Sequence, residues 1–172
     1  MPWGRFPGAR VILGPEMKST GEVMGIAPTV PAAYAKTQFA IDYAMPEGGL
    51  AFVSVNDGDK RAIVSLIRDV ESMGFGIVAT QGTAKVLRAS GIDCLEVSKI
   101  HEADAADGEG ERPSALDLIR DGKISLIINT PFGTATRSDG YEIRSAAVRH
   151  GICHTTTLAG AQAMIAGMEA AR

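Results

Sequence analysis

The chain has 172 residues, of which 45% are hydrophobic and 22% charged, and its formal net charge is −3. This length supports one compact domain whose core needs neither a disulfide nor a metal for stability. The slightly acidic balance excludes a strongly basic nucleic-acid-binding protein, and the chain contains no run of about 18 apolar residues that could cross a membrane.

The N-terminal part of the chain differs in composition from the rest. Residues 1–25 are rich in Gly and Pro, which predicts an irregular segment that packs against another body. A short helix is predicted over 31–44, where apolar side chains recur at helical spacing after a proline. The stretch 45–49 is typical of a linker, so we expect one unit over 1–49 and a second over 50–172. The start of the chain lacks the apolar core of a signal peptide, and the cytoplasm is the expected location.

From residue 50 onward, strand and helix patterns alternate. Strands are predicted over 50–55, 76–80, 94–97, 124–130 and 152–156, and helices over 59–73, 83–90, 114–122, 141–150 and 158–169, with loops over 101–113 and 131–140. Five strand–helix units in strict alternation imply a three-layer α/β fold, in which a five-stranded parallel sheet carries helices on both faces. Asp57 or Asp59 can cap the first of these helices, and Gly74 can end it.

Metal-binding and redox chemistry find little support in the sequence. The two cysteines, Cys94 and Cys153, lie in apolar, strand-like contexts without metal-ligand spacing, so we expect buried, reduced thiols. The three histidines are not paired as metal ligands either. We expect the acidic loop 101–113 to be solvated, with a divalent-cation site there as the minor alternative.

Polar side chains follow each predicted strand at its carboxyl end, where ligands bind in open parallel sheets. In chain order they are Lys60, the Thr80–Gln81–Gly82–Thr83 turn, Lys99, the Asn129–Thr130 pair, and Thr155, Thr156 and Thr157. The lysines supply positive charge, and threonine hydroxyls together with the first N–H groups of a helix at residue 83 supply hydrogen-bond donors. Gly82 allows a close approach of the backbone. The pattern therefore predicts an anion site, most simply for a phosphate.

Each of these residues also has a purely structural interpretation. The turn at 80–83 is a good helix entry, the two lysines suit a solvated surface, and Asn129 can link two loops. Their convergence on one edge of one sheet favours the anion site. Asp139 is the best candidate for a general base, yet it is equally a natural N-cap for the helix after it. No nucleophile elbow, P-loop or dinucleotide-binding glycine pattern is present, so binding is favoured over catalysis.

Several stretches together resemble a known family. They are LGPEMKSTGEVMG (13–25), SVNDGDK, ATQGTAKVL, VSKIHE, IINTPFG and SDGYEIRSAAVRHGI. The first resembles the end of the second ATP-grasp half of carbamoyl-phosphate synthase large subunits, and the others resemble the C-terminal regulatory domain of the same subunits. The resemblance covers essentially the whole chain and implies a methylglyoxal-synthase-like, Rossmann-like sheet preceded by an irregular segment and a short helix.

The resemblance also implies a function. The family makes carbamoyl phosphate from bicarbonate, ammonia released by a glutaminase small subunit, and ATP with Mg or Mn, for the pyrimidine and arginine pathways. Its regulatory domain in bacterial members binds UMP as inhibitor and IMP as activator, and contributes to an ornithine site. The chain would then be a non-catalytic part of a longer subunit, with no cofactor or metal of its own.

Individual residues carry over by their motifs. Lys60, Thr80, Gly82, Thr83 and Lys99 match the effector phosphate site, Asn129 and Thr130 match nucleotide contacts, and Asp139 and Thr156 match the ornithine site. The chain departs from the family at Gln81, Pro131, Thr134, Ala135 and Gly140, where histidine, hydroxyl or basic residues are common. The phosphate half of the site is therefore better matched than the ribose and base half.

Two other functions remain open. A stand-alone enzyme like methylglyoxal synthase would share the fold and phosphate cradle, but its characteristic residues are replaced by NDGDK and NTPFG. An interaction module is the third interpretation, because the apolar side chains of residues 1–25 can drive self-association into a homo-oligomer.

Overall fold

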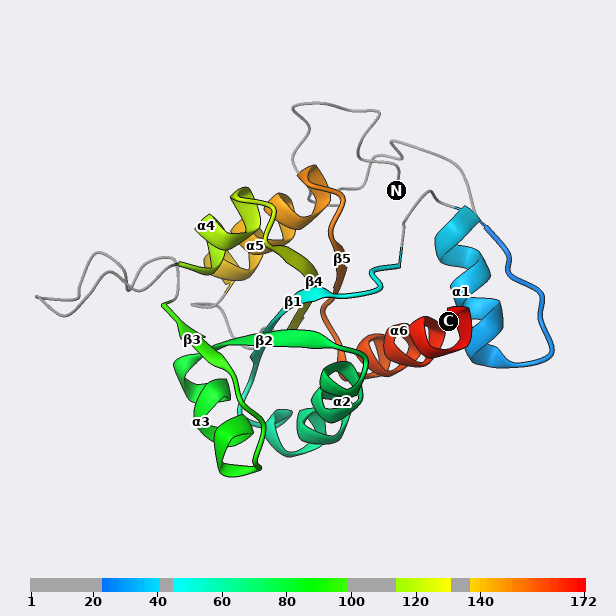
Figure 1. The fold of residues 1–172 in the computed structure, drawn as a ribbon. Coiled ribbons are helices and arrows are strands. Elements are labelled where there is room, and N and C mark those ends of the chain that lie inside the picture. Colours follow the sequence, from blue (N-terminus) through cyan, green and yellow to red (C-terminus); the bar gives the residue numbers. More distant parts are fainter. Residues whose placement is uncertain (1–22, 41–44, 99–113, 131–136) are drawn as a thin grey trace, which may run out of the picture.

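A computed structural model describes residues 23–40, 45–98, 114–130 and 137–172, which form a three-layer α/β fold (Figure 1). The strands are β1 (Gly49–Val55), β2 (Phe75–Thr80), β3 (Leu95–Val97), β4 (Ile124–Thr130) and β5 (Cys153–Thr155). The helices are α1 (Val30–Ala40), α2 (Lys60–Ser72), α3 (Gln81–Ala89), α4 (Ala115–Arg120), α5 (Arg137–Arg149) and α6 (Leu158–Ala171). All strand pairs are parallel, in the order β3-β2-β1-β4-β5, which confirms the predicted fold class.

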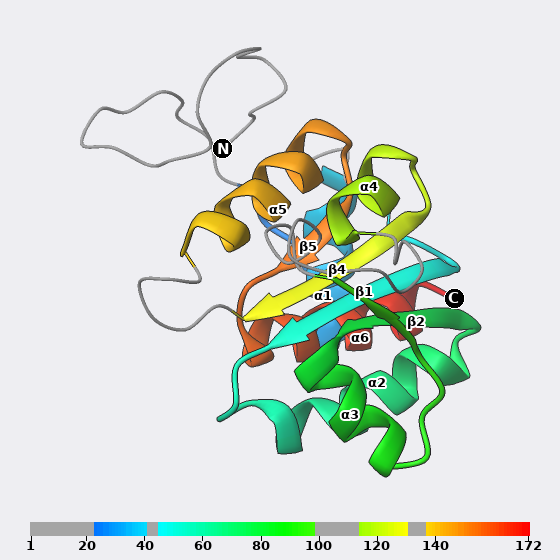
Figure 2. The same ribbon diagram turned by 90° about the vertical axis from the view of Figure 1, so that its left-hand side faces the viewer.

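Two apolar layers cover the sheet. Figure 2 shows α4 and α5 on one face, with α2, α3 and α6 on the other. Ile67 of α2, Leu87 of α3 and Ile165 of α6 are buried against one face of β1 and β4. Ile119 of α4 and Ala147 of α5 are buried against the other face. The central strand β4 is almost entirely buried and β1 is buried through its middle, as expected for parallel strands between two helical layers.

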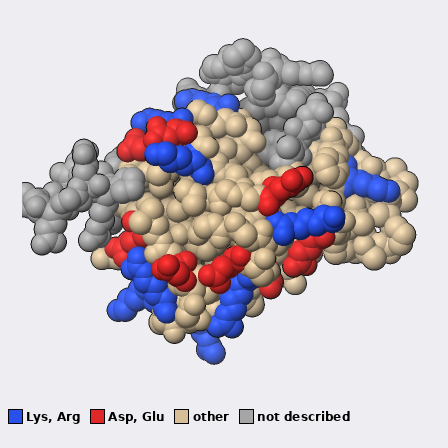
Figure 3. Space-filling model, viewed as in Figure 1, with Lys and Arg blue, Asp and Glu red and all other residues tan. Residues whose placement is uncertain are grey.

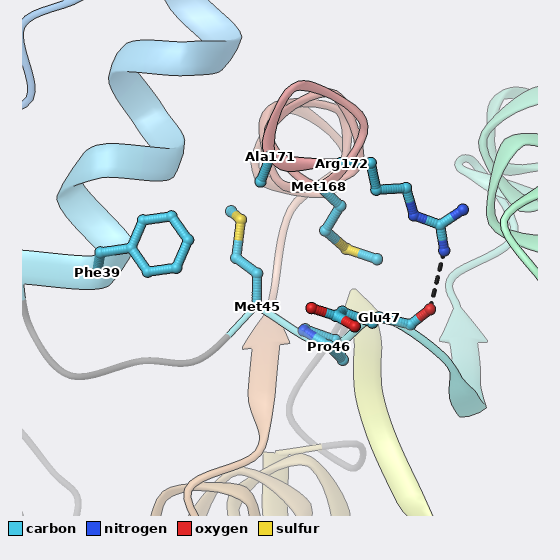
Figure 4. A pocket seen from close by; sticks show the side chains of 7 residues that line it. All are labelled: Phe39, Met45, Pro46, Glu47, Met168, Ala171 and Arg172. Atoms are coloured by element: carbon cyan, nitrogen blue, oxygen red, sulfur yellow. Dashed lines mark hydrogen bonds between the residues drawn. The ribbon is translucent and has the colours of Figure 1, made fainter.

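Helix α1 packs against α6 at the outside of the domain. A Cβ added at Gly167 of α6 would lie 2.9 Å from Tyr34 Cδ1, so glycine is what permits this close approach. Arg172 donates from Nη2 to the carbonyl oxygens of Glu47 at 2.8 Å and Met73 at 2.5 Å. A groove of about 350 Å³ lies beside these contacts (Figure 4), at the amino edge of the sheet, and its lining residues are Phe39, Met45, Pro46, Glu47, Met168, Ala171 and Arg172.

Helices α3 and α5 begin two and four residues earlier than the sequence predicts. Helix α3 starts at Gln81 instead of 83, because Thr80 is the N-cap residue, with an extended backbone. Helix α5 starts at Arg137 instead of 141, so the predicted loop over 131–140 is wrong for its last four positions. Gly140 has a poor intrinsic helix propensity, but it is buried inside α5, and tertiary packing overrides that propensity.

The described residues contain neither a spanning helix nor a metal cluster. No helix within the described ranges combines the length and the apolarity needed to span a bilayer. Among the same residues, no three His, Cys, Asp or Glu side chains gather as metal ligands. Cys94 and Cys153 are free and buried, as predicted. Burial raises the pKa of Cys153 to about 11, so this thiol stays protonated near neutral pH. The acidic loop 101–113 lies outside the described residues.

Candidate anion site at the carboxyl edge of the sheet

The turn from β2 into α3 presents backbone N–H groups that its own N-cap side chain does not satisfy. Thr80 is the N-cap residue of α3, yet its side chain makes no capping hydrogen bond. By contrast, Ser114 caps α4 and Thr157 caps α6, each accepting from a first-turn N–H. The first N–H groups of a helix have no partner within the helix and lie at its positive end. The N-terminus of α3 therefore offers donors to an anion.

The threonine hydroxyls of this turn are buried and hold the strand ends together. The Thr83 hydroxyl accepts from the Val55 N–H at 3.2 Å, which ties α3 to the end of β1. The Thr80 hydroxyl lies 3.3 Å from the Ser54 hydroxyl and 3.4 Å from that of Thr83. Thr80 and Thr83 are only 6% and 1% exposed. We therefore expect the turn to contact an anion mainly through its backbone N–H groups.

The ammonium group of Lys60 lies against this same turn. A Cβ added at Gly82 would lie 3.0 Å from Lys60 Nζ, so the absence of a side chain at position 82 makes room for the ammonium group. Lys60 Nζ also pairs with the carboxylate of Asp57 at 2.5 Å. The Lys60 side chain is 23% exposed, whereas that of Asp57 is 94% exposed. A partly buried cation thus sits at the positive end of α3, which is an environment that attracts a negative ligand.

A row of polar side chains crosses the carboxyl edge on the face that α4 and α5 cover. Ser54 of β1 is the register partner of Asn129 of β4, and the Ser54 hydroxyl lies 3.3 Å from that of Thr80 in β2. Asn129 is 6% exposed, and its Nδ2 has no hydrogen-bond partner in the described part of the protein. A buried amide donor without an acceptor costs about 1–3 kcal/mol and calls for an explanation.

Asn56 was not singled out from the sequence, but it links the two central strand ends. Its backbone N–H donates to the Thr130 carbonyl at 3.2 Å and to the Thr130 hydroxyl at 3.3 Å. Its side-chain Nδ2 donates to the Thr130 hydroxyl at 3.1 Å and to Asp59 Oδ2 at 2.5 Å. Thr130, predicted as a nucleotide contact, is therefore engaged within the protein. The only sequence signal for Asn56 was its place directly after a strand.

Three predicted site residues remain: Lys99, Asp139 and Thr156. Lys99 lies outside the described residues. Asp139 is the third residue of α5, so its prediction as an N-cap is wrong because the helix starts at Arg137; its side chain is not described. Thr156 is exposed and directly follows β5, at the same edge as Asn129 but one strand farther out. The structure thus brings together Lys60, Thr80, Gly82 and Thr83, with Asn129 and Thr130 on the adjoining strand ends.

The charged side chains in Figure 3 lie on the side of the molecule where the strands begin, opposite the candidate site. On that side, Lys and Arg side chains alternate with Asp and Glu side chains, so it carries no extended patch of one sign. His154 of β5 lies apart from the Lys60 cluster, and its Nδ1 lies 3.2 Å from the Ile152 carbonyl oxygen. Burial lowers the pKa of His154, and the nearby Arg144 charge lowers it further.

Comparisons with known proteins agree with this architecture. Residues 62–156 match the family described as the MGS-like domain. The chain is 47% identical over 171 residues to the carbamoyl phosphate synthase large chain of Acidobacterium capsulatum, which covers 99% of this chain and 15% of that relative. It is 44% identical over 164 residues to the C-terminal section of that large chain in Aquifex aeolicus, covering 95% of this chain and 29% of the relative. The corresponding section in Methanocaldococcus jannaschii is 45% identical over 171 residues, which is 99% of this chain and 26% of the relative.

These matches decide the family. The matched range begins within α2 and ends just after β5, so it contains the turn that faces Lys60, the strands β2 to β5 and the helices α3, α4 and α5, whereas β1 and Lys60 itself precede it. The chain spans only 15% of the Acidobacterium relative. The resemblance predicted from the motifs is confirmed: the chain belongs to the MGS-like domain family, and its sequence matches the part of carbamoyl phosphate synthase large chains that carries this domain.

Proposed function

We propose that the chain is the regulatory, effector-binding part of a carbamoyl phosphate synthase large chain, and that it binds nucleoside monophosphates at the carboxyl edge of the sheet. UMP would act as inhibitor and IMP as activator of carbamoyl phosphate synthesis for the pyrimidine and arginine pathways. The whole enzyme is an ATP-dependent ligase that also needs the remainder of the large chain and a glutaminase small subunit. In this proposal the chain works in the cytoplasm.

The approach of Lys60 to Gly82 carries the proposal. A lysine ammonium group lies at the N-terminus of a helix whose first N–H groups are left uncapped by Thr80. Two positive features close together favour a bound anion, and the Asp57 carboxylate that already pairs with Lys60 Nζ is almost fully exposed. A phosphate group, with its negative oxygens, can accept from the N–H groups and from the ammonium group together.

Asn129 supports extension of the site from a phosphate to a nucleotide. Its buried Nδ2 lacks an acceptor among the described residues, and Asn129 is the register neighbour of Ser54, which in turn contacts Thr80. A ligand with acceptor atoms beyond its phosphate, such as a ribose or a base, can supply the acceptor that this amide needs. Lys99 completes the phosphate set by its place in the sequence.

A second, weaker ligand is ornithine. Thr156 and Asp139 follow β5 and β4 respectively, so both belong to the same edge of the sheet as the phosphate site. An amino acid with a cationic side chain needs a carboxylate partner, and Asp139 is the residue in this pair that supplies one. In this proposal the chain alone performs no catalysis, because binding at its edge regulates active sites elsewhere in the large chain.

Calorimetric titration of the chain with UMP and IMP tests the proposal. We expect heat from at least one of them at concentrations up to millimolar, and little from uridine or inosine, which lack the phosphate. Lys60→Ala should weaken binding about tenfold or more, since it removes a charge-assisted contact. Lys85→Ala is the matched control, because Lys85 is an exposed lysine on the same helix as Gly82. Absence of heat with both nucleotides would refute the proposal.

A turnover assay separates binding from the alternative enzyme function. Dihydroxyacetone phosphate should not be converted to methylglyoxal by the chain. Conversion that disappears in Asp139→Asn would favour a methylglyoxal-synthase-like enzyme instead of a regulatory domain.

A further inference from the structure

The Asn56 side chain uses both of its polar atoms to join three structural elements. Its Nδ2 donates to Asp59 Oδ2 at 2.5 Å and to the Thr130 hydroxyl at 3.1 Å. Its Oδ1 accepts from the Asp59 N–H at 3.2 Å. Asn56 follows β1, Asp59 precedes α2 and Thr130 ends β4, so one half-buried amide connects all three.

This network also determines how α2 begins. Asp59 is the N-cap residue of α2, and an aspartate there normally accepts from a first-turn N–H. Here its side chain makes no capping hydrogen bond, because its carboxylate accepts from Asn56 instead. Both helices that begin beside the candidate site, α2 and α3, therefore start without a side-chain cap.

The residue directly after Asp59 is Lys60, the first residue of α2. The backbone position of Lys60 is set by the preceding residue, Asp59. The Asn56 side chain hydrogen-bonds to both the N–H and the carboxylate of Asp59. From that position the Lys60 side chain brings Nζ against Gly82. The Asn56 network thus connects the end of β4, where Asn129 lies, to the ammonium group at the N-terminus of α3.

We propose that Asn56 is a positioning residue of the anion site: it fixes the start of α2 against the end of β4 and so holds the Lys60 ammonium group at Gly82. The inference rests on the proposed anion-binding function. Asn56 acts through Lys60 and not by touching the ligand. Its loss should therefore weaken the contribution of Lys60 to phosphate binding and leave other contacts in place.

A double-mutant cycle of Asn56→Ala with Lys60→Ala tests this coupling. In the otherwise unchanged chain, Asn56→Ala should weaken binding of the tighter nucleotide and of inorganic phosphate about tenfold, within the range of coupling energies for residues in one network. In the Lys60→Ala background the same substitution should change affinity less than about twofold. An equal loss in both backgrounds would overturn the inference, because Asn56 would then act independently of Lys60.

The position of Lys60 is followed directly by NMR of the ligand-free chain. The Lys60 Cε–Hε resonance, assigned by its loss in Lys60→Ala, should shift in Asn56→Ala toward the position typical of a solvated lysine. If the resonance does not move, the positioning role is refuted even if nucleotides bind. If it moves but no nucleotide or phosphate binds to the original chain, the proposed function fails while the positioning role holds.

Two further variants control for general loss of stability. Ser125→Ala removes hydrogen bonds from the Ser125 hydroxyl to the Gly48 and Leu50 carbonyls at the amino edge of the sheet, at 2.8 and 3.3 Å. It should lower stability yet leave the Lys60 resonance and the affinity unchanged. Thr130→Val, which keeps the carbonyl but removes the hydroxyl end of the network, should move the Lys60 resonance in the same direction as Asn56→Ala. An unmoved Lys60 resonance in Thr130→Val would contradict the inference. This test remains valid even if Asn56→Ala does not fold.

Discussion

Lys60 and Gly82 are 22 positions apart in sequence but in contact in the fold, and a Cβ at position 82 would lie 3.0 Å from Lys60 Nζ. They come from the first turns of α2 and α3, which follow the neighbouring strands β1 and β2. Because the strands are parallel, both helices begin at the same edge of the sheet. The contact therefore follows from the topology, and the chemistry of the edge depends on it.

Gly82→Ala separates the effect on binding from the effect on stability. Alanine is the better helix former, so the free energy of unfolding should rise by up to about 1 kcal/mol. The added methyl group displaces the Lys60 ammonium group, so nucleotide affinity should fall several-fold. Urea unfolding and calorimetry measure the two effects, and tighter binding by Gly82→Ala would show that Lys60 does not act at this turn.

Asp57→Asn should strengthen anion binding. The Asp57 carboxylate lies 2.5 Å from Lys60 Nζ and competes with any anionic ligand for that ammonium group. Neutralising it removes both the competitor and a repulsive charge, so affinity for UMP or IMP should rise a few-fold at low ionic strength. The gain should shrink as salt is added, because Asp57 is exposed and its field is screened. Weaker binding by Asp57→Asn would mean that this carboxylate helps to hold the ligand.

Thr83→Val should destabilise the fold more than Thr83→Ser. The buried Thr83 hydroxyl accepts from the Val55 N–H at 3.2 Å, and valine has a similar shape but no acceptor. An unsatisfied buried N–H costs about 1–3 kcal/mol, which chemical denaturation can resolve. Serine keeps the hydroxyl and should lose less. A Thr83→Val variant as stable as the original chain would show that this hydrogen bond contributes little to stability.

His154 should make the protein less stable in mild acid. Its pKa in the folded protein is lowered, first by burial, from an ordinary value of 6.5. The unfolded chain therefore binds the proton first as the pH falls, and the free energy of unfolding decreases from about pH 7 downward until the folded pKa is reached. At higher pH, His154 should contribute no pH dependence.

Unfolding of His154→Gln at a series of pH values between about 5 and 8 checks this expectation. The variant should lose part of the decrease in stability on the acid side. His150→Gln is the control, since His150 is exposed just after α5. A pH profile that is the same in the His154 variant as in the original chain would contradict the assignment.

Much of the fold could be read from the sequence because buried parallel strands are marked by continuous apolar runs. The strand 124–130 was predicted at the bounds that β4 has, and its seven residues are almost all buried. Helix starts were less predictable. The stretch 131–140 was predicted as a loop, but α5 begins at Arg137, and packing stabilises the helix at the buried Gly140. Thr83 suggested a helix start two residues later than the true one, because both threonines of the turn have capping chemistry.

The gathering of hydroxyl and amide side chains and of Lys60 at the carboxyl edge could be predicted from the alternation of strands and helices, which allows little else. The role of each group depends on contacts that form only when the chain is folded. Thr83 bonds to the end of β1, Thr130 bonds to Asn56, and Lys60 pairs with Asp57 and faces Gly82. The physical reason is that hydrogen bonds depend on distances of about 3 Å and on direction, and such contacts between strands 74 positions apart leave no periodic trace in the sequence.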